Sequence, residues 1–125
     1  MKGILKVTGH ARDFGGLYVL LEDGRPVYVG ISRRVVARLR EHLTGKTHFD
    51  ASLVYAMARK KWDGNGRRGE LMKNDAFRKG FSGAQERLAQ CKVAFIEVVD
   101  PVTLYLFEVY AALELNCEWN TFRTH

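Results

Sequence analysis

Cysteines are scarce in this sequence, and long hydrophobic runs are absent. Its two cysteines, Cys91 and Cys117, show no Cys-x-x-Cys spacing. This argues against a disulfide framework or a zinc site and favours buried thiols in a reducing compartment. No apolar stretch approaches the ~20 residues that a membrane span needs, and the first residues lack the apolar run of a signal peptide. We therefore expect a cytoplasmic protein without membrane association.

Acidic residues are too few to balance the basic ones. The 125 residues include 20 Lys and Arg but only 14 Asp and Glu, for a net charge of +6. Residues 44–92 contain eleven of the basic and five of the acidic residues, so this segment alone accounts for the net charge. A basic segment attracts phosphate backbones, although a solvated surface is the simpler alternative. The length predicts one domain, residues 1–125.

Two strands are predicted near the N-terminus, Leu17–Leu21 and Pro26–Val29. A two-residue turn between them would put Tyr18 and Tyr28 on opposite faces, because a one-residue slip flips every side chain of a strand. A three-residue loop, with Gly24 in the left-handed conformation, pairs Tyr18 directly with Tyr28. The same loop collects the aliphatic residues of both strands on one face. Burial of the aliphatic residues therefore favours this loop, with both phenols on the other face.

Helices are predicted on both sides of a basic loop. The first runs between a Ser32 N-cap and a stop at Gly45, and its Arg34, Arg38 and His42 lie four residues apart on one face. A second helix is expected from a cap at Asp50 to its end at residues 59–61, followed by a glycine-rich basic loop over 62–69. Residues 82–85 have the pattern of a capping box that opens another helix.

The C-terminal part contains a carboxylate in an apolar setting. A strand is predicted over 93–99, followed by a helix from Pro101 to about Leu115 with Asp100 as its N-cap. Glu108 lies on the same face of this helix as Leu104 and Ala112. A buried, unpaired carboxylate costs several kcal/mol. Glu108 is therefore expected either to bind a metal ion or to form a salt bridge, for example with an arginine of the first helix.

An ordered set of residues resembles the core of the GIY-YIG endonuclease superfamily, in its small stand-alone bacterial or phage form. The set is Gly16-Leu17-Tyr18, Tyr28-Val29-Gly30, Arg38, His42, Glu108 and Asn120. The resemblance covers about residues 16–43 and 93–120. It implies an α/β fold with a small three-stranded antiparallel sheet flanked by helices, and the residues at about 44–90 are then a basic helical insertion.

The resemblance also implies an activity, namely a metal-dependent endonuclease that hydrolyses phosphodiester bonds in DNA. Its catalytic residues would be Tyr18, Tyr28, Arg38, His42, Glu108 and Asn120. Arg38 would bind the scissile phosphate, since a guanidinium stays charged and can contact two oxygens at once. Tyr18, alone or through Tyr28 or His42, would deprotonate the attacking water, with a phenol pKa lowered by Arg38 and the metal ion.

The metal ion would be one Mg²⁺ or Mn²⁺ on Glu108, because magnesium needs few protein ligands and shares oxygens of the substrate. For Asn120, a hydrogen bond to a loop backbone is the alternative to a role in the site. For His42, a purely structural role is nearly as good an explanation.

Further residues are candidates for contact with nucleic acid: Arg34, His48, Lys60, Lys61, Trp62, Arg67 and Arg68. A solvated helix face is sufficient to explain Arg34. Trp62 either stacks on a base or anchors its loop to the core. A catalytically inactive nucleic-acid-binding module and a restriction-type dimeric nuclease stay open as alternative functions. The sequence shows no long apolar stripe suited to an obligate dimer, which predicts a monomer.

Overall fold

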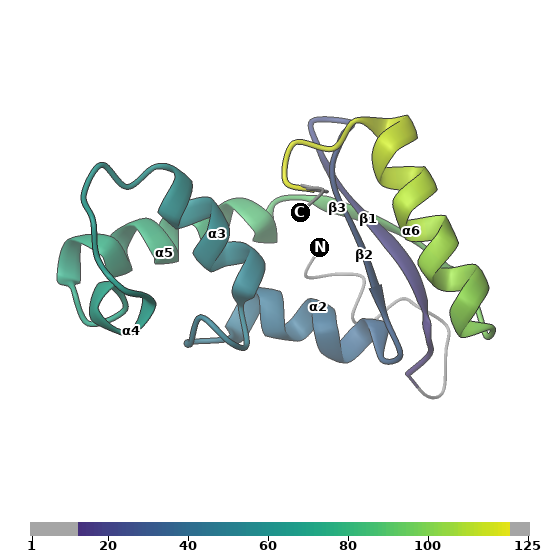
Figure 1. The fold of residues 1–125 in the computed structure, drawn as a ribbon, viewed down its shortest axis with the longest axis horizontal. Coiled ribbons are helices and arrows are strands. Elements are labelled where there is room, and N and C mark those ends of the chain that lie inside the picture. The colour runs from purple at the N-terminus through teal and green to yellow at the C-terminus, as the bar shows by residue number, and fades with distance from the viewer. Residues whose placement is uncertain (1–12, 121–125) are drawn as a thin grey trace. The chain divides into compact units, whose positions relative to one another are not determined.

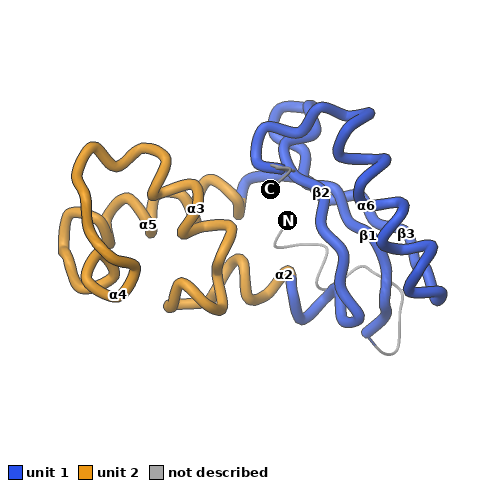
Figure 2. Tube along the Cα trace, in the orientation of Figure 1, with its two compact units in different colours: residues 1–38, 90–125 blue, residues 39–89 orange. Residues whose placement is uncertain are grey.

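The computed structural model describes residues 13–120, and the chain divides into two compact units. Figure 2 colours residues 1–38 and 90–125 as the first unit and residues 39–89 as the second. The boundary falls inside helix α2, Val35–Thr44. The basic segment predicted at about 44–90 makes up most of the second unit. None of the helices within residues 13–120 is long and apolar enough to cross a membrane.

The first unit is built on a three-stranded antiparallel sheet in the order β2-β1-β3. Its strands are β1 (Gly16–Glu22), β2 (Arg25–Ser32) and β3 (Lys92–Glu97). Helix α6 (Pro101–Leu115) lies along one face of the sheet (Figure 1). The core on this face consists of Leu17, Val29, Leu104, Ala112 and Cys117. The predicted α/β class with a small antiparallel sheet is confirmed.

The register of the hairpin differs from the prediction, although the tyrosines do share a face. Glu22 pairs with Arg25, so the turn contains only Asp23 and Gly24, with φ of 51° and 77°. This is the two-residue turn with two left-handed positions, and the expected three-residue loop is wrong. A β-bulge nevertheless puts both tyrosines on one face of the sheet. Leu20 pairs with Tyr28 but Leu21 pairs with Pro26, so Val27 is an extra residue in β2.

The bulge decides which residues stand opposite each other. Tyr18 pairs with Gly30 rather than with Tyr28. On the third strand, Phe95 is the partner of Tyr18. The face opposite α6 therefore carries a row of Gly30, Tyr18 and Phe95, with Tyr28 beside it.

Helix α2 is capped by a residue far away in the sequence. The Asp13 carboxylate accepts hydrogen bonds from the backbone N–H groups of Val36 and Ala37, at 2.8 and 2.9 Å, and from that of Phe14 at 2.8 Å. Ser32, the predicted cap, instead accepts from the Arg34 N–H within the preceding turn. The predicted N-cap is therefore wrong, because a carboxylate from another segment reaches the free N–H groups of the first turn.

The second unit is helical: α3 (Ser52–Lys60), α4 (Arg68–Leu71) and α5 (Asp75–Ala89). Helices α3 and α5 pack through buried side chains, with the Tyr55 and Phe77 ring centroids 5.6 Å apart. Asn74 accepts a hydrogen bond from the Phe77 N–H at 3.0 Å at the start of α5. Residues 82–85 therefore lie inside a helix that has already begun, and the capping box predicted there is wrong.

The Gln85 side chain has a different function in this unit. Its Nε2 donates to the carbonyls of His42 and Gly45, at 3.1 and 2.8 Å. These two carbonyls lie at the C-terminal end of α2, where a helix leaves backbone acceptors without partners. Gln85 thus ties α5 to the end of α2.

Candidate active site

Tyr18 and Tyr28 meet on the sheet face opposite α6. Their ring centroids are 6.2 Å apart, and Tyr18 is only 1% exposed. The ring of Tyr18 extends over Gly30, where an added Cβ atom would overlap its ring carbons and hydroxyl. The two tripeptides are thus related by direct contact, because the glycine of the second makes room for the tyrosine of the first.

Both phenols are held neutral by their surroundings. Burial raises the pKa of Tyr18 well above that of a free phenol, and Tyr28 and Glu108 add to the rise. Arg38 opposes it, both by its charge and by a hydrogen bond to the Tyr18 oxygen, but does not outweigh burial. Arg38 thus lowers the pKa of Tyr18 as expected, but in the protein alone burial outweighs it; the contribution expected from the metal ion stays a prediction.

The phenols also interact with each other. Burial raises the pKa of Tyr28, Arg38 opposes this rise, and a hydrogen bond donated by Tyr18 further lowers it. A chain of donors therefore runs from the Arg38 guanidinium to the Tyr18 oxygen and from the Tyr18 hydroxyl to Tyr28. Arg38 belongs to the first turns of α2, which Asp13 fixes at its N-terminus.

Glu108 lies on the packed face of α6 between the buried Leu104 and Ala112, as predicted, and is itself half-buried. It is close enough to both tyrosines to raise their pKa values. Burial raises the pKa of Glu108 itself, and among the described residues no cation counteracts this. A salt bridge with an arginine would lower it, so this alternative is not supported within residues 13–120.

The raised pKa of Glu108 fits a cation that the protein itself does not supply. Within residues 13–120 there is no cluster of three or more His, Cys, Asp or Glu side chains that could enclose a metal ion. The residues present therefore suit a cation with one protein carboxylate and several waters, which is the usual way that proteins bind Mg²⁺.

Asn120 uses both ends of its side-chain amide on the sheet edge. Its Oδ1 accepts from the Val29 N–H at 2.7 Å, and its Nδ2 donates to the Val29 carbonyl at 2.8 Å. The neighbouring Trp119 N–H donates to the Val27 carbonyl at 3.0 Å. The chain after α6 thus closes the open edge of β2, and the backbone alternative for Asn120 is the one observed. This interaction fixes the strand between Tyr28 and Gly30.

The roles of His42 and Arg34 have to be judged from their own surroundings. His42 is completely buried and belongs by its packing to the second unit. Arg34 is exposed, and its backbone N–H closes the turn to Ser32. The roles predicted for both residues stay predictions.

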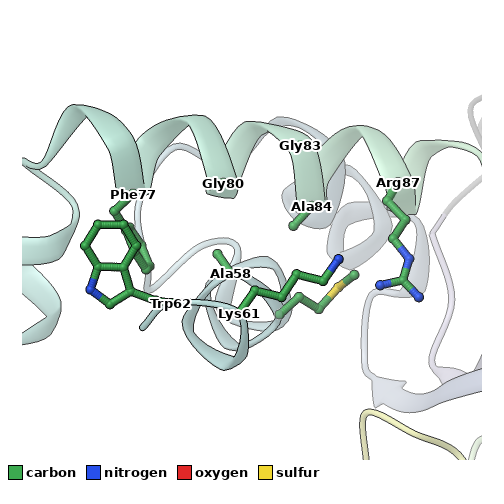
Figure 3. Close-up of a pocket in the computed structure, with 9 residues that line it drawn as sticks. Ala58, Lys61, Trp62, Phe77, Gly80, Gly83, Ala84 and Arg87 are labelled. Carbon is green, nitrogen blue, oxygen red and sulfur yellow. The ribbon is translucent and has the colours of Figure 1, made fainter. Parts of the chain in front are cut away.

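The candidates for nucleic-acid contact in the second unit are divided between two pockets and a loop. Trp62 makes an edge contact with Phe77 at 5.5 Å, and its Nε1 is buried, which favours the anchoring alternative. Figure 3 shows these rings at one end of a pocket of about 120 Å³, with Lys61 and Arg87 toward the other end. His48, Lys60 and Arg68 line a second pocket of about 370 Å³. Arg67 lies at the exposed N-cap of α4.

Several residues of these sites were missed from the sequence. Asp13 gives no local signal, because its partners lie 23 and 24 residues away. Arg59 and Tyr55 also line the second pocket. They have the helical spacing of ordinary α3 residues, and only the folded unit shows that they face the same hollow as Arg68.

Solved structures of one nuclease domain match this chain over nearly its full length. They are structures of the GIY-YIG N-terminal endonuclease domain of UvrC from Thermotoga maritima. The form bound to magnesium matches with a TM-score of 0.51 and 18% identity, over 96% of this chain and 93% of that chain. A point mutant bound to its catalytic divalent cation matches with a TM-score of 0.54 and 15% identity, over 98% and 100%.

The chain has the GIY-YIG endonuclease fold. No protein-family model and no curated protein matches the sequence. At these identities the likeness establishes the GIY-YIG fold, and the chemistry of this chain has to be argued from its own residues.

Proposed function

We propose that this protein is a metal-dependent endonuclease that hydrolyses phosphodiester bonds in DNA. The observation that carries the proposal is the constellation of Tyr18, Tyr28, Arg38 and Glu108 in one unit with the GIY-YIG fold. Similar domains of UvrC have been solved with a catalytic divalent cation, including magnesium. We therefore propose one Mg²⁺ or Mn²⁺ ion on Glu108.

In this mechanism the side chains of the chain itself bind the phosphate and move a proton. The Arg38 guanidinium contacts the scissile phosphate while it donates to the Tyr18 hydroxyl, so that phosphate and phenol are aligned by one group. Tyr18 first passes its hydroxyl proton to Tyr28, which releases its own proton to solvent, and the hydrogen bond from Tyr18 to Tyr28 provides the path. Water then attacks phosphorus and gives a proton to the Tyr18 phenolate. The new P–O bond forms, the bond to the leaving oxygen breaks, and the leaving oxygen takes a proton from solvent.

The raised pKa of Tyr18 limits when this proton transfer can occur. A neutral phenol is a poor base, and the charge of Glu108 contributes to keeping Tyr18 neutral. A divalent cation on Glu108 would cancel this contribution and would supply Lewis-acid stabilisation of the leaving oxygen. Tyr18 therefore stays neutral in the free enzyme and would become a base only with substrate and cation bound.

Cleavage assays on single-stranded, duplex and branched DNA, with Mg²⁺ and with chelator, test the proposal. We expect Mg²⁺-dependent cleavage that is lost in Glu108→Gln and in Tyr18→Phe, while both variants still bind DNA. Glu114→Gln is the matched control, because Glu114 is an exposed glutamate of the same helix. DNA binding without any cleavage by the wild type would support the inactive binding module instead.

A further inference from the structure

The larger pocket of the second unit has the composition of a nucleotide site. It has a volume of about 370 Å³, within the range of pockets that bind small molecules. Arg59, Lys60 and Arg68 line it, and no acidic side chain of residues 13–120 does. Two arginines and a lysine around one hollow attract an anion, and a phosphate group can accept hydrogen bonds from both kinds of side chain.

Aromatic rings extend along one side of this pocket. Tyr55 forms part of its wall, and the Arg68 guanidinium carbon lies 5.4 Å from the centre of the Tyr55 ring. The His48 ring is 5.9 Å from Tyr55 and 4.1 Å from Phe49. Phe49 is 78% exposed, so its outer face is open to solvent. A lone exposed aromatic residue is common, but this one continues a row of rings that begins inside a cationic pocket.

We propose that this pocket and Phe49 form a subsite for a single-stranded segment of nucleic acid. Arg59, Lys60 and Arg68 hold a backbone phosphate, and a base stacks on Phe49. An open aromatic face next to cations suits unpaired bases, because the faces of paired bases are already covered in a duplex. The subsite rests on the proposed function, in that the strand it holds belongs to the nuclease substrate.

Binding without divalent cation tests the subsite independently of cleavage. Fluorescence anisotropy of a labelled oligothymidine and of a duplex of equal length gives both affinities. Loss of one stacked base in Phe49→Ala should weaken binding of the single strand roughly 5- to 100-fold, with a smaller effect on the duplex. Lys60→Gln should weaken both and flatten their salt dependence. The controls are Phe49→Tyr, which keeps the ring, and Lys73→Gln, which removes an exposed charge outside the pocket.

The outcomes separate the subsite from the nuclease. An equal loss on single strand and duplex for Phe49→Ala, or no loss on either, would overturn the subsite. A protein that binds oligothymidine through Phe49 but cleaves nothing would support the subsite and refute the endonuclease. Cleavage by the wild type together with unchanged single-strand binding in Phe49→Ala would support the endonuclease and refute the subsite.

A separate observation concerns helix α6, most of whose surface is apolar and in water. Only Leu104 and Ala112 are buried, whereas Val102, Leu106, Tyr110 and Leu113 are each about two-thirds exposed. The prediction of a monomer rested on the absence of a long apolar stripe. The exposed residues of α6 form such a stripe. The exposed apolar residues of α6 leave on the order of 800 Å² in contact with water, if a whole aromatic side chain has ~150–250 Å². One partner contributes about this area to a standard protein–protein interface.

The exposed residues of α6 have the spacing of a helix-pairing seam. Val102, Leu106, Val109 and Leu113 follow one another at intervals of four, three and four residues, which is the a/d spacing of a coiled coil. They lie opposite the face that packs on the sheet. No charged residue interrupts the seam, so two chains of net charge +6 can approach through it without direct repulsion.

We infer that α6 is the interface of a homodimer, in which the seams of two copies pair about a two-fold axis. A second copy supplies the same uncharged seam, whereas nucleic acid would find no cation on it. The Leu106–Tyr110 hollow of about 310 Å³ on the helix surface provides a place for a side chain of the partner.

Sedimentation of the full chain tests the dimer. We expect a wild-type dimer and a monomeric Leu106→Glu variant with an unchanged far-UV circular dichroism spectrum, because Leu106 is already exposed within one chain. Phe49→Glu, an exposed residue of the other unit, is the control and should stay dimeric. A monomeric wild type, a dimeric Leu106→Glu variant, or wild-type protein that forms open-ended aggregates would overturn the inference.

Discussion

The contact between Gly30 and Tyr18 gives a physical reason for a glycine in the second tripeptide. In an antiparallel pair the side chains of directly opposed residues stand next to each other. The Tyr18 ring occupies the space that a side chain at position 30 would need. The same ring position brings its hydroxyl to Arg38 and Tyr28. Adding one methyl group at position 30 should therefore displace the Tyr18 hydroxyl from Arg38 and Tyr28.

Gly30→Ala is expected to displace the Tyr18 phenol and to lower kcat about a hundredfold, as misplacement by ~1 Å does in other enzymes. Overpacking should also cost about 1–3 kcal/mol of stability, which urea denaturation measures. Gly80→Ala is the matched control, because an added Cβ atom there meets nothing within 4 Å. Full activity in Gly30→Ala would show that the position of Tyr18 does not matter.

Glu108→Gln should abolish Mg²⁺-dependent cleavage without destabilising the fold. Burial raises the pKa of Glu108, so its ionisation opposes folding, and the wild type should lose stability as the pH rises through that pKa. Glutamine removes this dependence, and the variant should be as stable as the wild type at neutral pH or more so. Denaturation curves at acid and neutral pH measure this. A large loss of stability in the variant would restore the salt-bridge alternative.

The raised pKa of Glu108 should also appear in the pH dependence of cation affinity. Protonated Glu108 has no charge for a divalent cation, so Mn²⁺ affinity should fall as the pH drops, starting above the ~4.3 of an ordinary glutamate. Calorimetric titration at several pH values tests this, with Glu108→Gln as the non-binding reference. Mn²⁺ affinity that is independent of pH and of Glu108 would exclude this residue as the ligand.

At the scale of elements, helix α2 carries residues of both units. Its first turns carry Arg38, its N-terminus is capped by Asp13, and the carbonyls of His42 and Gly45 at its end accept from Gln85. Burial alone would raise the pKa of Asp13, but the N–H groups of Ala37, Val36 and Phe14 outweigh it and lower the pKa. The position of Arg38 thus depends on a carboxylate that has no place in the proposed chemistry.

Asp13→Ala should therefore reduce both stability and activity. Loss of an N-cap costs about 0.5–2 kcal/mol, and a frayed first turn releases Arg38. Because the pKa of Asp13 is lowered in the folded protein, its contribution is present at neutral pH and is lost as the pH falls through that pKa. Thermal melts of wild type and variant should consequently converge in acid. Asp13→Asn retains an acceptor and should lie between them.

At the scale of the molecule, the excess positive charge and the proposed catalytic residues lie in different units. The proposed catalytic residues Tyr18, Tyr28, Arg38 and Glu108 belong to the first unit, and the basic segment makes up most of the second. This separation suggests that the second unit supplies affinity, while the first performs hydrolysis. It also lets affinity and turnover be altered one at a time.

Replacing Lys60, Lys61, Arg67 and Arg68 together by glutamine should raise the Kd for DNA and leave kcat at saturation nearly unchanged. For each phosphate that the variant no longer neutralises, the slope of log K against log salt should fall by ~0.7–0.9. Arg25→Gln with Lys92→Gln, both exposed in the first unit, is the control for a general effect of charge. An unchanged slope would mean that the four cations do not touch nucleic acid.

The sequence by itself determined much of this protein. Periodicity and propensity located the three strands, helix α6 with its Asp100 cap, and the packed face of α6 that carries Glu108. The motif residues Tyr18, Tyr28 and Arg38 were identified without coordinates. These signals are readable because a strand or helix is specified by neighbours a few residues apart.

Only the tertiary structure decided the rest. The bulge at Val27, the cap from Asp13 and the hold of Asn120 on Val29 join segments whose pairing no local pattern records. The direction of the Tyr18 pKa was also beyond the sequence, which shows that a cation is near but not how completely the phenol is removed from water. Desolvation and long-range hydrogen bonds depend on which distant segments are brought into contact, and that is a property of the folded chain alone.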